Sequence, residues 1–269
     1  MELNALDLEI GGCVAQLLAS ARVCDSVLER YRPFVASAGA TRPAMVLEIR
    51  EGELFEPALE RDTEAAVEAI GPTAVRLTGG ARGGFDLATR RGFVDDARGL
   101  GAVDSLLRVA LSLVLPTLDK GRGFLVHGAL VPAGDEGLVF TGESGAGKST
   151  VARALGAACD ELVVLRPDGT LTAHATPYWQ GRPLERACRR VICLRRSASP
   201  VHQPLRGALA ARRLARDVVR YVTLPSVERA LLELVARACE QTQVIDAACP
   251  EGEAFLPYLT RQLELRRAA

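Results

Sequence analysis

The chain has 269 residues, of which 48% are hydrophobic and 25% are charged. These ordinary globular values exclude a disordered tail and allow one large domain or two modest ones. The 33 basic and 33 acidic side chains cancel, so we expect no broad electrostatic attraction to nucleic acid or to an anionic membrane. Lysine occurs only at Lys120 and Lys148, and all other basic residues are arginines. Each lysine is therefore unusual, and arginine clusters carry less weight.

The cysteines and histidines do not indicate a disulfide framework or a structural zinc site. The seven cysteines contain no CxxC pair, and the three histidines are not spaced as metal ligands. The first residues, MELNALDLEIGG, do not resemble a secretory signal, and the longest apolar run, at 109–116, is too short to span a membrane. These features predict a cytoplasmic protein with reduced thiols and no membrane partner.

Residues 1 to about 100 read as a small N-terminal α+β region without a chemical motif, suited to docking a substrate. Strands are expected at 6–10, 45–49, 74–77, 85–89 and 92–94, with a hairpin turn at 89–92, and helices at 24–31 and 63–70. Apolar residues then recur at helical spacing over 101–120 until Pro116. We expect this helix to pack on the second part, which makes 101–269 the larger domain.

The second part alternates strands and helices, which indicates an α/β arrangement. Strands are expected at 125–131, 138–141, 162–165, 171–175, 190–194 and 244–245. Helices are expected at 150–158, 207–221, 226–240 and 251–267.

One motif carries the functional argument. The residues from Gly142 to Ser149, GESGAGKS, fit the phosphate-loop (Walker A) pattern GxxxxGK[ST], between an expected strand and an expected helix. Such glycines let backbone N–H groups surround phosphate oxygens at a helix N-terminus, where the dipole favours anions. Lys148 would reach the β- and γ-phosphates, and the Ser149 hydroxyl would bind Mg²⁺. The expected nucleotide-binding residues are Gly142, Glu143, Ser144, Gly145, Ala146, Gly147, Lys148, Ser149 and Thr150.

Other patterns narrow the class of phosphate-loop protein. The chain contains neither NKxD nor an LSGGQ-like sequence, which argues against a GTPase and against a transporter-type ATPase. Asp246 follows only a short, weak apolar run, so it is a poor candidate for the acid of an ordinary ATPase. Asp160 and Glu161 directly precede an expected strand. One carboxylate could hold Mg²⁺ while the other accepts a proton from an attacking hydroxyl.

The segments FLVHGALV (124–131), GLVFTGESGAGKS (137–149) and CDELVVLRPDG (159–169) resemble HPr kinase/phosphorylase. The TPYW segment at 176–179 looks like that of a divergent branch encoded beside ribosomally made, modified peptides. The resemblance covers about 120–182. It implies a catalytic domain like that of phosphoenolpyruvate carboxykinase, bound ATP and Mg²⁺, and a protein or peptide substrate with an acceptor serine. It is also compatible with a homo-oligomer.

By position, the resemblance implies a catalytic role for three residues. His127 matches the family's histidine near the active site, and Asp160 matches the acid that accepts the serine proton. The phosphate-loop lysine, Lys148, is the third expected catalytic residue. Glu161 stands where the family has a metal-binding Asp, so the expected metal ligands are Ser149 and Glu161. The family's downstream glycine-rich signature, linked to dephosphorylation, has no match here, which argues against phosphorylase activity.

Several of these residues also have ordinary structural interpretations. His127 could be a hydrogen-bonded core residue of a strand, and the acidic pair 160–161 could lie in a solvated turn. An arginine stripe at 212, 216 and 220, with Arg213 beside it, is favoured as a solvated helix face over a clamp for an acidic peptide or phosphate. Arg166 and Arg182 could touch phosphate.

The aromatic pair 178–179 could stack on adenine or lie in the core, and Cys159 is expected to be a small buried residue. The sequence therefore predicts an ATP-dependent kinase acting on a protein or peptide serine. The alternatives are an ATP-sensing binding module without phosphotransfer and a small-molecule kinase.

Overall fold

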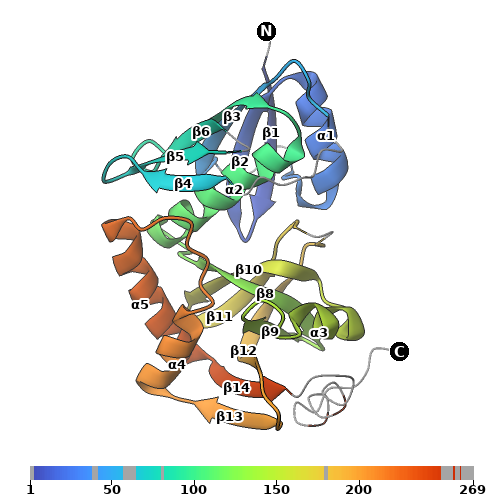
Figure 1. Cartoon of the computed structure of the whole chain (residues 1–269), viewed down its shortest axis with the longest axis vertical. Helices are drawn as coiled ribbons and strands as arrows, with labels where there is room; N and C mark the ends of the chain where they lie inside the picture. Colours follow the sequence, from blue (N-terminus) through green and yellow to red (C-terminus); the bar gives the residue numbers. More distant parts are fainter. Residues whose placement is uncertain are drawn as a thin grey trace. The chain divides into compact units, whose positions relative to one another are not determined.

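The structure is a computed structural model that describes residues 3–37, 42–56, 65–79, 82–178, 181–249, 257 and 261. The chain divides into two compact units. The first contains residues 1–119 and 220–230, and the second contains residues 120–219 and 231–269. Each unit is built on its own mixed β-sheet, so the protein is of mixed α/β type (Figure 1).

The first unit has a seven-stranded sheet with the order β1-β2-β3-β7-β6-β5-β4. The β2–β3 and β3–β7 pairs are parallel, and the remaining neighbours are antiparallel. The strands are β1 (Asn4–Ile10), β2 (Cys13–Ala19), β3 (Met45–Glu51), β4 (Ala66–Ala69), β5 (Ala74–Thr78), β6 (Arg82–Asp86) and β7 (Arg91–Ala97). The helices are α1 (Ala21–Tyr31), η1 (Arg32–Phe34), α2 (Leu100–Val114) and η2 (Leu115–Thr117).

Helix α2 belongs to the first unit, which corrects the expectation that it packs on the second part. It contacts β3, β6 and β7 of the first sheet, and its Leu106 lies beside Gly92 of β7. The observed boundary therefore falls after Asp119 rather than near residue 100. Apolar spacing identified a buried helix, but it carried no information about which sheet would cover it.

The second unit has a seven-stranded sheet with the order β11-β10-β8-β9-β12-β14-β13, closed in part by a β11–β12 pairing. Strand β12 is parallel to both of its neighbours, β9 and β14, and the other pairs are antiparallel. The strands are β8 (Phe124–Ala133), β9 (Glu136–Gly142), β10 (Cys159–Asp168), β11 (Thr170–Ala175), β12 (Glu185–Arg196), β13 (Val201–Leu205) and β14 (Gln243–Cys249). The helices are α3 (Lys148–Leu155), α4 (Gly207–Ala215) and the larger part of α5 (Pro225–Gln241), whose residues 225–230 are counted with the first unit.

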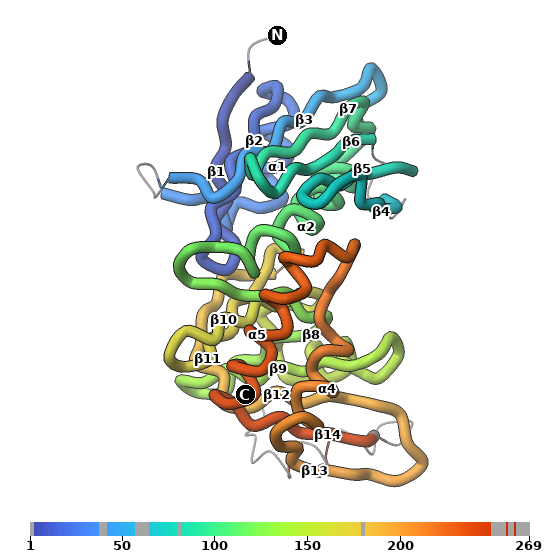
Figure 2. Tube along the Cα trace, turned by 90° about the vertical axis from the view of Figure 1, so that its left-hand side faces the viewer, coloured from blue at the N-terminus to red at the C-terminus, as the bar shows by residue number. Residues whose placement is uncertain are grey.

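Helices α3 and α4 lie on opposite faces of this second sheet. Val151 and Leu155 of α3 pack in one cluster with Phe140 of β9 and Ile192 of β12. Arg213 of α4 instead reaches Asp246, whose strand neighbour Ile245 belongs to the α3 cluster. Since neighbouring strand residues point to opposite faces, the sheet presents separate α3 and α4 faces. Figure 2 follows the chain through β12, β13 and α4 from a second direction.

Several expected elements differ from the structure. The expected helix at 63–70 is wrong over its described part, because 66–69 form β4. The expected helix at 207–221 ends at Ala215. The sequence did not predict this end, because no glycine or proline follows Ala215 directly. Strands β2 and β13 were not expected, and the expected helix at 251–267 lies almost wholly outside the described residues. The hairpin near residue 90 is confirmed, but its turn lies at 87–90 between β6 and β7 rather than at 89–92.

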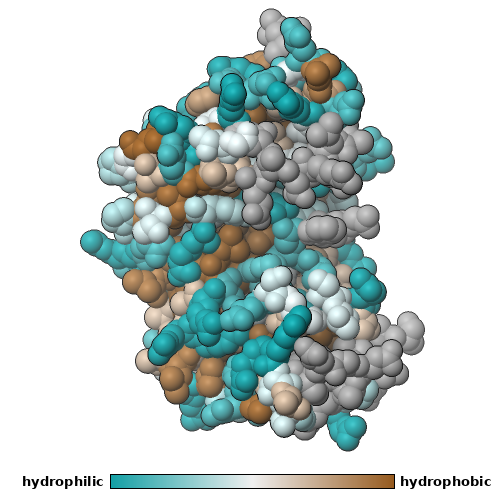
Figure 3. Space-filling view, in the orientation of Figure 1, coloured by the Kyte–Doolittle hydropathy of each residue, from teal (hydrophilic) through white to brown (hydrophobic). Residues whose placement is uncertain are grey.

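Among the described residues, one stretch, Leu100–Thr117, is long and apolar enough to cross a membrane, but 72% of it is buried inside the protein. Burial of this kind is what the core helix of a globular unit shows. Exposed large hydrophobic side chains are scattered through the sequence, for example Leu54, Leu209 and Leu232. The face in Figure 3 mixes hydrophilic and hydrophobic residues. Single exposed apolar side chains of this kind are normal and need no partner.

Candidate active site

The expected strand–loop–helix arrangement is present. Strand β9 ends at Gly142, and α3 begins at Lys148. Gly142, Gly145 and Gly147 have φ angles of 143°, 74° and 98°, which are conformations that glycine adopts without steric cost. At Gly142 a Cβ would also collide with the carbonyl of Leu194. The glycines are therefore required by the path of the loop itself.

Lys148 points into this loop. Its Nζ donates hydrogen bonds to the carbonyl of Gly142 at 2.8 Å and to that of Glu143 at 3.0 Å, and the residue is 7% exposed. Burial lowers the pKa of Lys148, while the nearby carboxylates of Asp217 and Asp160 oppose that shift. An ammonium group is thus held inside the glycine loop with two acidic side chains close to it.

Asp160 and His127 share the α3 face of the sheet. In the register of β8 and β10, Asp160 pairs with Ala129 and Leu162 pairs with His127, and Ala129 in turn pairs with Phe140 of β9. Because directly paired residues point to the same face, Asp160 and His127 lie on the side where α3 packs. His127 is exposed within an otherwise largely buried strand, so it is not a core residue.

Glu161 lies on the other face. The sequence suggested that the acidic pair precedes a strand, but β10 already begins at Cys159, so the two carboxylates alternate across the sheet. Glu161 pairs with Gly128, which pairs with Thr141. Ser149 belongs to α3. The strand geometry therefore separates the two expected metal ligands, Ser149 and Glu161.

A magnesium ion brought in on nucleotide phosphates needs only one or two protein oxygens. The exposed hydroxyl of Ser149, in the first turn of α3, suits that need. Within the described ranges, no group of three or more His, Cys, Asp or Glu side chains could hold a metal alone. The residues present therefore fit a phosphate-borne Mg²⁺ at Ser149, with Glu161 on the opposite face of the sheet.

Asp217 is a functional candidate that the sequence reasoning missed. The segment after α4 extends along β8 where β9 leaves it: the His127 N–H donates to the Asp217 carbonyl and the Val219 N–H to the Leu125 carbonyl, both at 2.9 Å. This segment brings Asp217 close enough to Lys148 to influence its pKa. The sequence placed the residue in the middle of a helix. The available signal for an extended segment was the acid followed by two β-branched apolar residues at 217–219.

The arginine stripe is only partly a solvated face. Because α4 ends at Ala215, the stripe does not continue to Arg220, which instead pairs with Glu228. Arg212 is exposed. Arg213 and Arg216, however, line a pocket beside the glycine loop, so the clamp interpretation gains support for these two residues.

The other sequence candidates lie elsewhere. Arg182 donates to the carbonyl of Gly156 at the far end of α3, and Arg166 lies beside Gly121. Tyr178 is buried, whereas Trp179 lies outside the described residues. Cys159 is buried as expected, and burial raises the pKa of its thiol to about 11. A protonated buried thiol is not a nucleophile.

The fold and this site together define a mixed α/β protein with a glycine loop between a strand and a helix. No family profile matches the chain, and no curated protein matches it. Among solved structures, the chain is similar to the HPr(Ser) kinase/phosphatase from Coxiella burnetii, with 13% identity and a TM-score of 0.31. That match covers 52% of this chain and 87% of the other. It names the family suggested by the sequence, but a likeness at this level carries no argument about activity.

Proposed function

We propose that the protein is an ATP-dependent kinase that transfers the γ-phosphoryl group to a serine hydroxyl of a protein or peptide. The observation that carries the proposal is the glycine loop with the Lys148 ammonium held inside it and Asp160 on the same side of the sheet. Backbone N–H groups of the loop and the first turn of α3 would bind phosphate oxygens.

In this proposal the substrate hydroxyl oxygen forms a bond to the γ-phosphorus, and the bond to the β-phosphate oxygen breaks, which releases ADP. Asp160 takes the hydroxyl proton, and Lys148 stabilises the negative charge on the transferring group. Bound Mg²⁺ would neutralise further phosphate charge, held by Ser149. The exposed His127 would orient the acceptor on the same face.

The remaining parts of the proposal concern substrate and location. The residues of the first unit, with no chemical motif of their own, would dock the substrate. Six cysteines, Cys13, Cys24, Cys159, Cys188, Cys193 and Cys239, are free thiols, which fits a reducing, cytoplasmic compartment.

The test combines γ-labelled ATP, Mg²⁺, the purified chain and two sources of acceptor: peptides encoded beside its gene, and a cell lysate. Asp160→Asn is compared with Glu161→Gln, a matched neutralisation on the opposite face of the same strand. We expect Asp160→Asn to retain ATP binding and lose transfer by at least about a hundredfold, and Glu161→Gln to retain most of both. Lys148→Ala should lose ATP binding or turnover.

Three results would contradict this proposal in different ways. Wild-type transfer by Asp160→Asn would remove the base assignment. Tight ATP binding without transfer to any acceptor would indicate the ATP-sensing module. Transfer only to free amino acids or small hydroxy acids would indicate a small-molecule kinase.

A further inference from the structure

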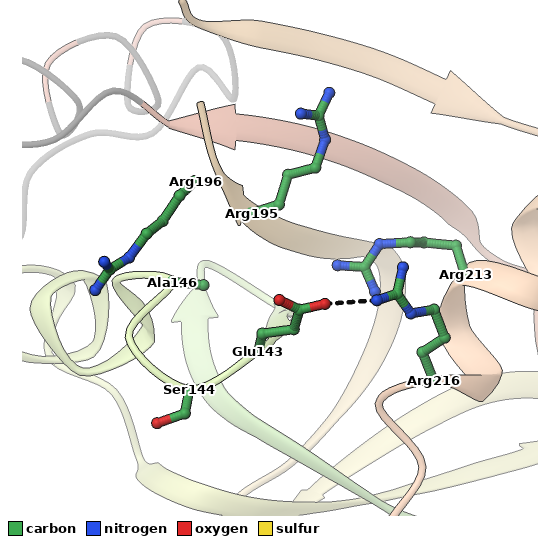
Figure 4. A pocket seen from close by; sticks show the side chains of 7 residues that line it. All are labelled: Glu143, Ser144, Ala146, Arg195, Arg196, Arg213 and Arg216. Atoms are coloured by element: carbon green, nitrogen blue, oxygen red, sulfur yellow. Dashed lines mark hydrogen bonds and ion pairs between the residues drawn. The ribbon is translucent and has the colours of Figure 1, made fainter. Parts of the chain in front are cut away.

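A pocket of about 270 Å³ opens beside the first half of the glycine loop. We call it the arginine pocket, because four of its lining residues are arginines (Figure 4). Its principal lining residues are Arg195, Arg196, Arg213, Arg216, Glu143 and Ser144. Lys148 and Ser149 do not line it, but Glu143, Ser144 and Ala146 of the glycine loop do, so the pocket adjoins the place where the loop would hold phosphates.

The arginine pocket lies where parallel strands end. Strand β9 ends at Gly142 and its parallel neighbour β12 ends at Arg196. In open α/β sheets, ligands bind at the carboxyl ends of the parallel strands. The pocket therefore lies at the edge of the sheet where a nucleotide bound by the glycine loop would also be expected.

Two of the arginines are fixed from behind by one buried and one half-buried acid. Arg213 pairs with Asp217 at 2.9 Å and with Asp246 at 3.5 Å, and it donates to the carbonyl of Leu194 at 3.1 Å. Arg195 pairs with the same Asp246 at 2.9 Å. Such pairing orients the guanidinium groups before any ligand arrives, which lowers the entropy cost of binding.

The other two arginines contact residues of the glycine loop. Arg196 donates to the carbonyl of Gly145 at 2.9 Å. Arg216 forms an ion pair with Glu143, and their side chains are 61% and 67% exposed; Figure 4 shows the Glu143 carboxylate directed at this guanidinium. An exposed pair of this kind contributes at most about 1 kcal/mol, so an incoming anion can replace Glu143 at little cost.

We propose that the arginine pocket binds a carboxylate of the acceptor, so that the acceptor serine belongs to an acidic peptide segment. This inference rests on the proposed function and names its substrate class. The Glu143 carboxylate already accepts a hydrogen bond from the Arg216 guanidinium, which shows that a carboxylate can occupy this position. The volume suits one or two acidic side chains and is below the range typical for a whole drug-sized ligand. The lining carries four arginines and Glu143, and the paired acids Asp217 and Asp246 behind them still leave a positive balance.

The test measures peptide binding, which does not require phosphate transfer. The probe is a fluorescein-labelled peptide with one serine flanked on both sides by Asp residues, and the matched probe has Asn in their place. Anisotropy titrations use the full chain at low salt, both without nucleotide and with a non-hydrolysable ATP analogue and Mg²⁺. Arg216→Gln and Arg195→Gln/Arg216→Gln are compared with Arg212→Gln, which removes the same charge from the exposed side of α4.

We expect the Asp peptide to bind more tightly than the Asn peptide. Arg216→Gln should weaken the Asp peptide roughly fivefold and the double variant further, whereas Arg212→Gln should leave it unchanged. Equal binding of the two peptides, or equal weakening by Arg212→Gln, would overturn the inference. So would pyrophosphate binding that depends on Arg216 without any peptide binding, because the pocket would then take phosphate. The kinase proposal fails separately, through the absence of transfer from ATP.

Discussion

The ion pair between Arg213 and Asp217 offers a test of how the site is held together. The two side chains are only 12% and 4% exposed, and Nη1 lies 2.9 Å from Oδ2. Replacing Asp217 with alanine leaves a nearly buried guanidinium without its main partner, which typically costs about 3–5 kcal/mol. Arg213 keeps Asp246 at 3.5 Å and the Leu194 carbonyl at 3.1 Å. We therefore expect a loss at the lower end, about 3 kcal/mol.

For a unit of this size, that loss corresponds to a decrease in Tm of roughly 6–12 °C. The assay is thermal and urea unfolding at pH 7, followed by circular dichroism. Arg212→Ala, an exposed residue of the same helix, serves as the control and should stay within about 0.5 kcal/mol of wild type. The double variant Arg213→Met/Asp217→Ala should be more stable than the sum of the single losses predicts, because no charge is left unpaired. A loss below about 1 kcal/mol for Asp217→Ala would refute the claim that the pair is effectively buried.

Three further predictions concern single residues. Gly142→Ala should destabilise the protein by about 2–4 kcal/mol, because its φ is 143° and a Cβ would meet the Leu194 carbonyl; an unchanged urea midpoint would contradict this. Burial lowers the pKa of His174, so the unfolded state takes up the proton first on acidification. The stability contributed by neutral His174 is complete above the pKa of the unfolded state and is lost as the pH falls below that value, by up to about 1.4 kcal/mol per pH unit. The free energy of unfolding of the wild type should therefore fall more steeply from pH 7 to 5 than that of His174→Gln. Burial raises the pKa of Cys159 to about 11, so in a thiol-labelling time course at pH 7.5 this cysteine should react only on unfolding, and rapid labelling in the native state would disprove its burial.

The sequence predicted the glycine loop and its flanking elements well, because the motif Gly142–Ser149 sits between an apolar strand and a short helix whose patterns are local. It also predicted the hairpin near residue 90 and α5. These elements are specified by neighbouring residues, so a single chain contains the necessary information.

The missed features depend on contacts between distant residues. Helix α2 was recognised but assigned to the wrong sheet, because hydrophobic spacing does not identify the partner surface. The opposite orientations of Asp160 and Glu161 followed from the exact start of β10, and strand boundaries are the least reliable part of a sequence prediction. Asp217 was missed because its role depends on the pairing of its backbone with β8.

That pairing also has a consequence for how the protein is made. The glycine loop, β9 and α3 are neighbours in the sequence, so they can associate as soon as they leave the ribosome. Segment 217–219, which brings Asp217 to the same place, is synthesised much later and must close a long stretch of chain to reach β8. Contacts of such large sequence separation form slowly. The loop and the charged groups around it are therefore expected to come together in two kinetic steps, the second of which begins only after α4 has been synthesised.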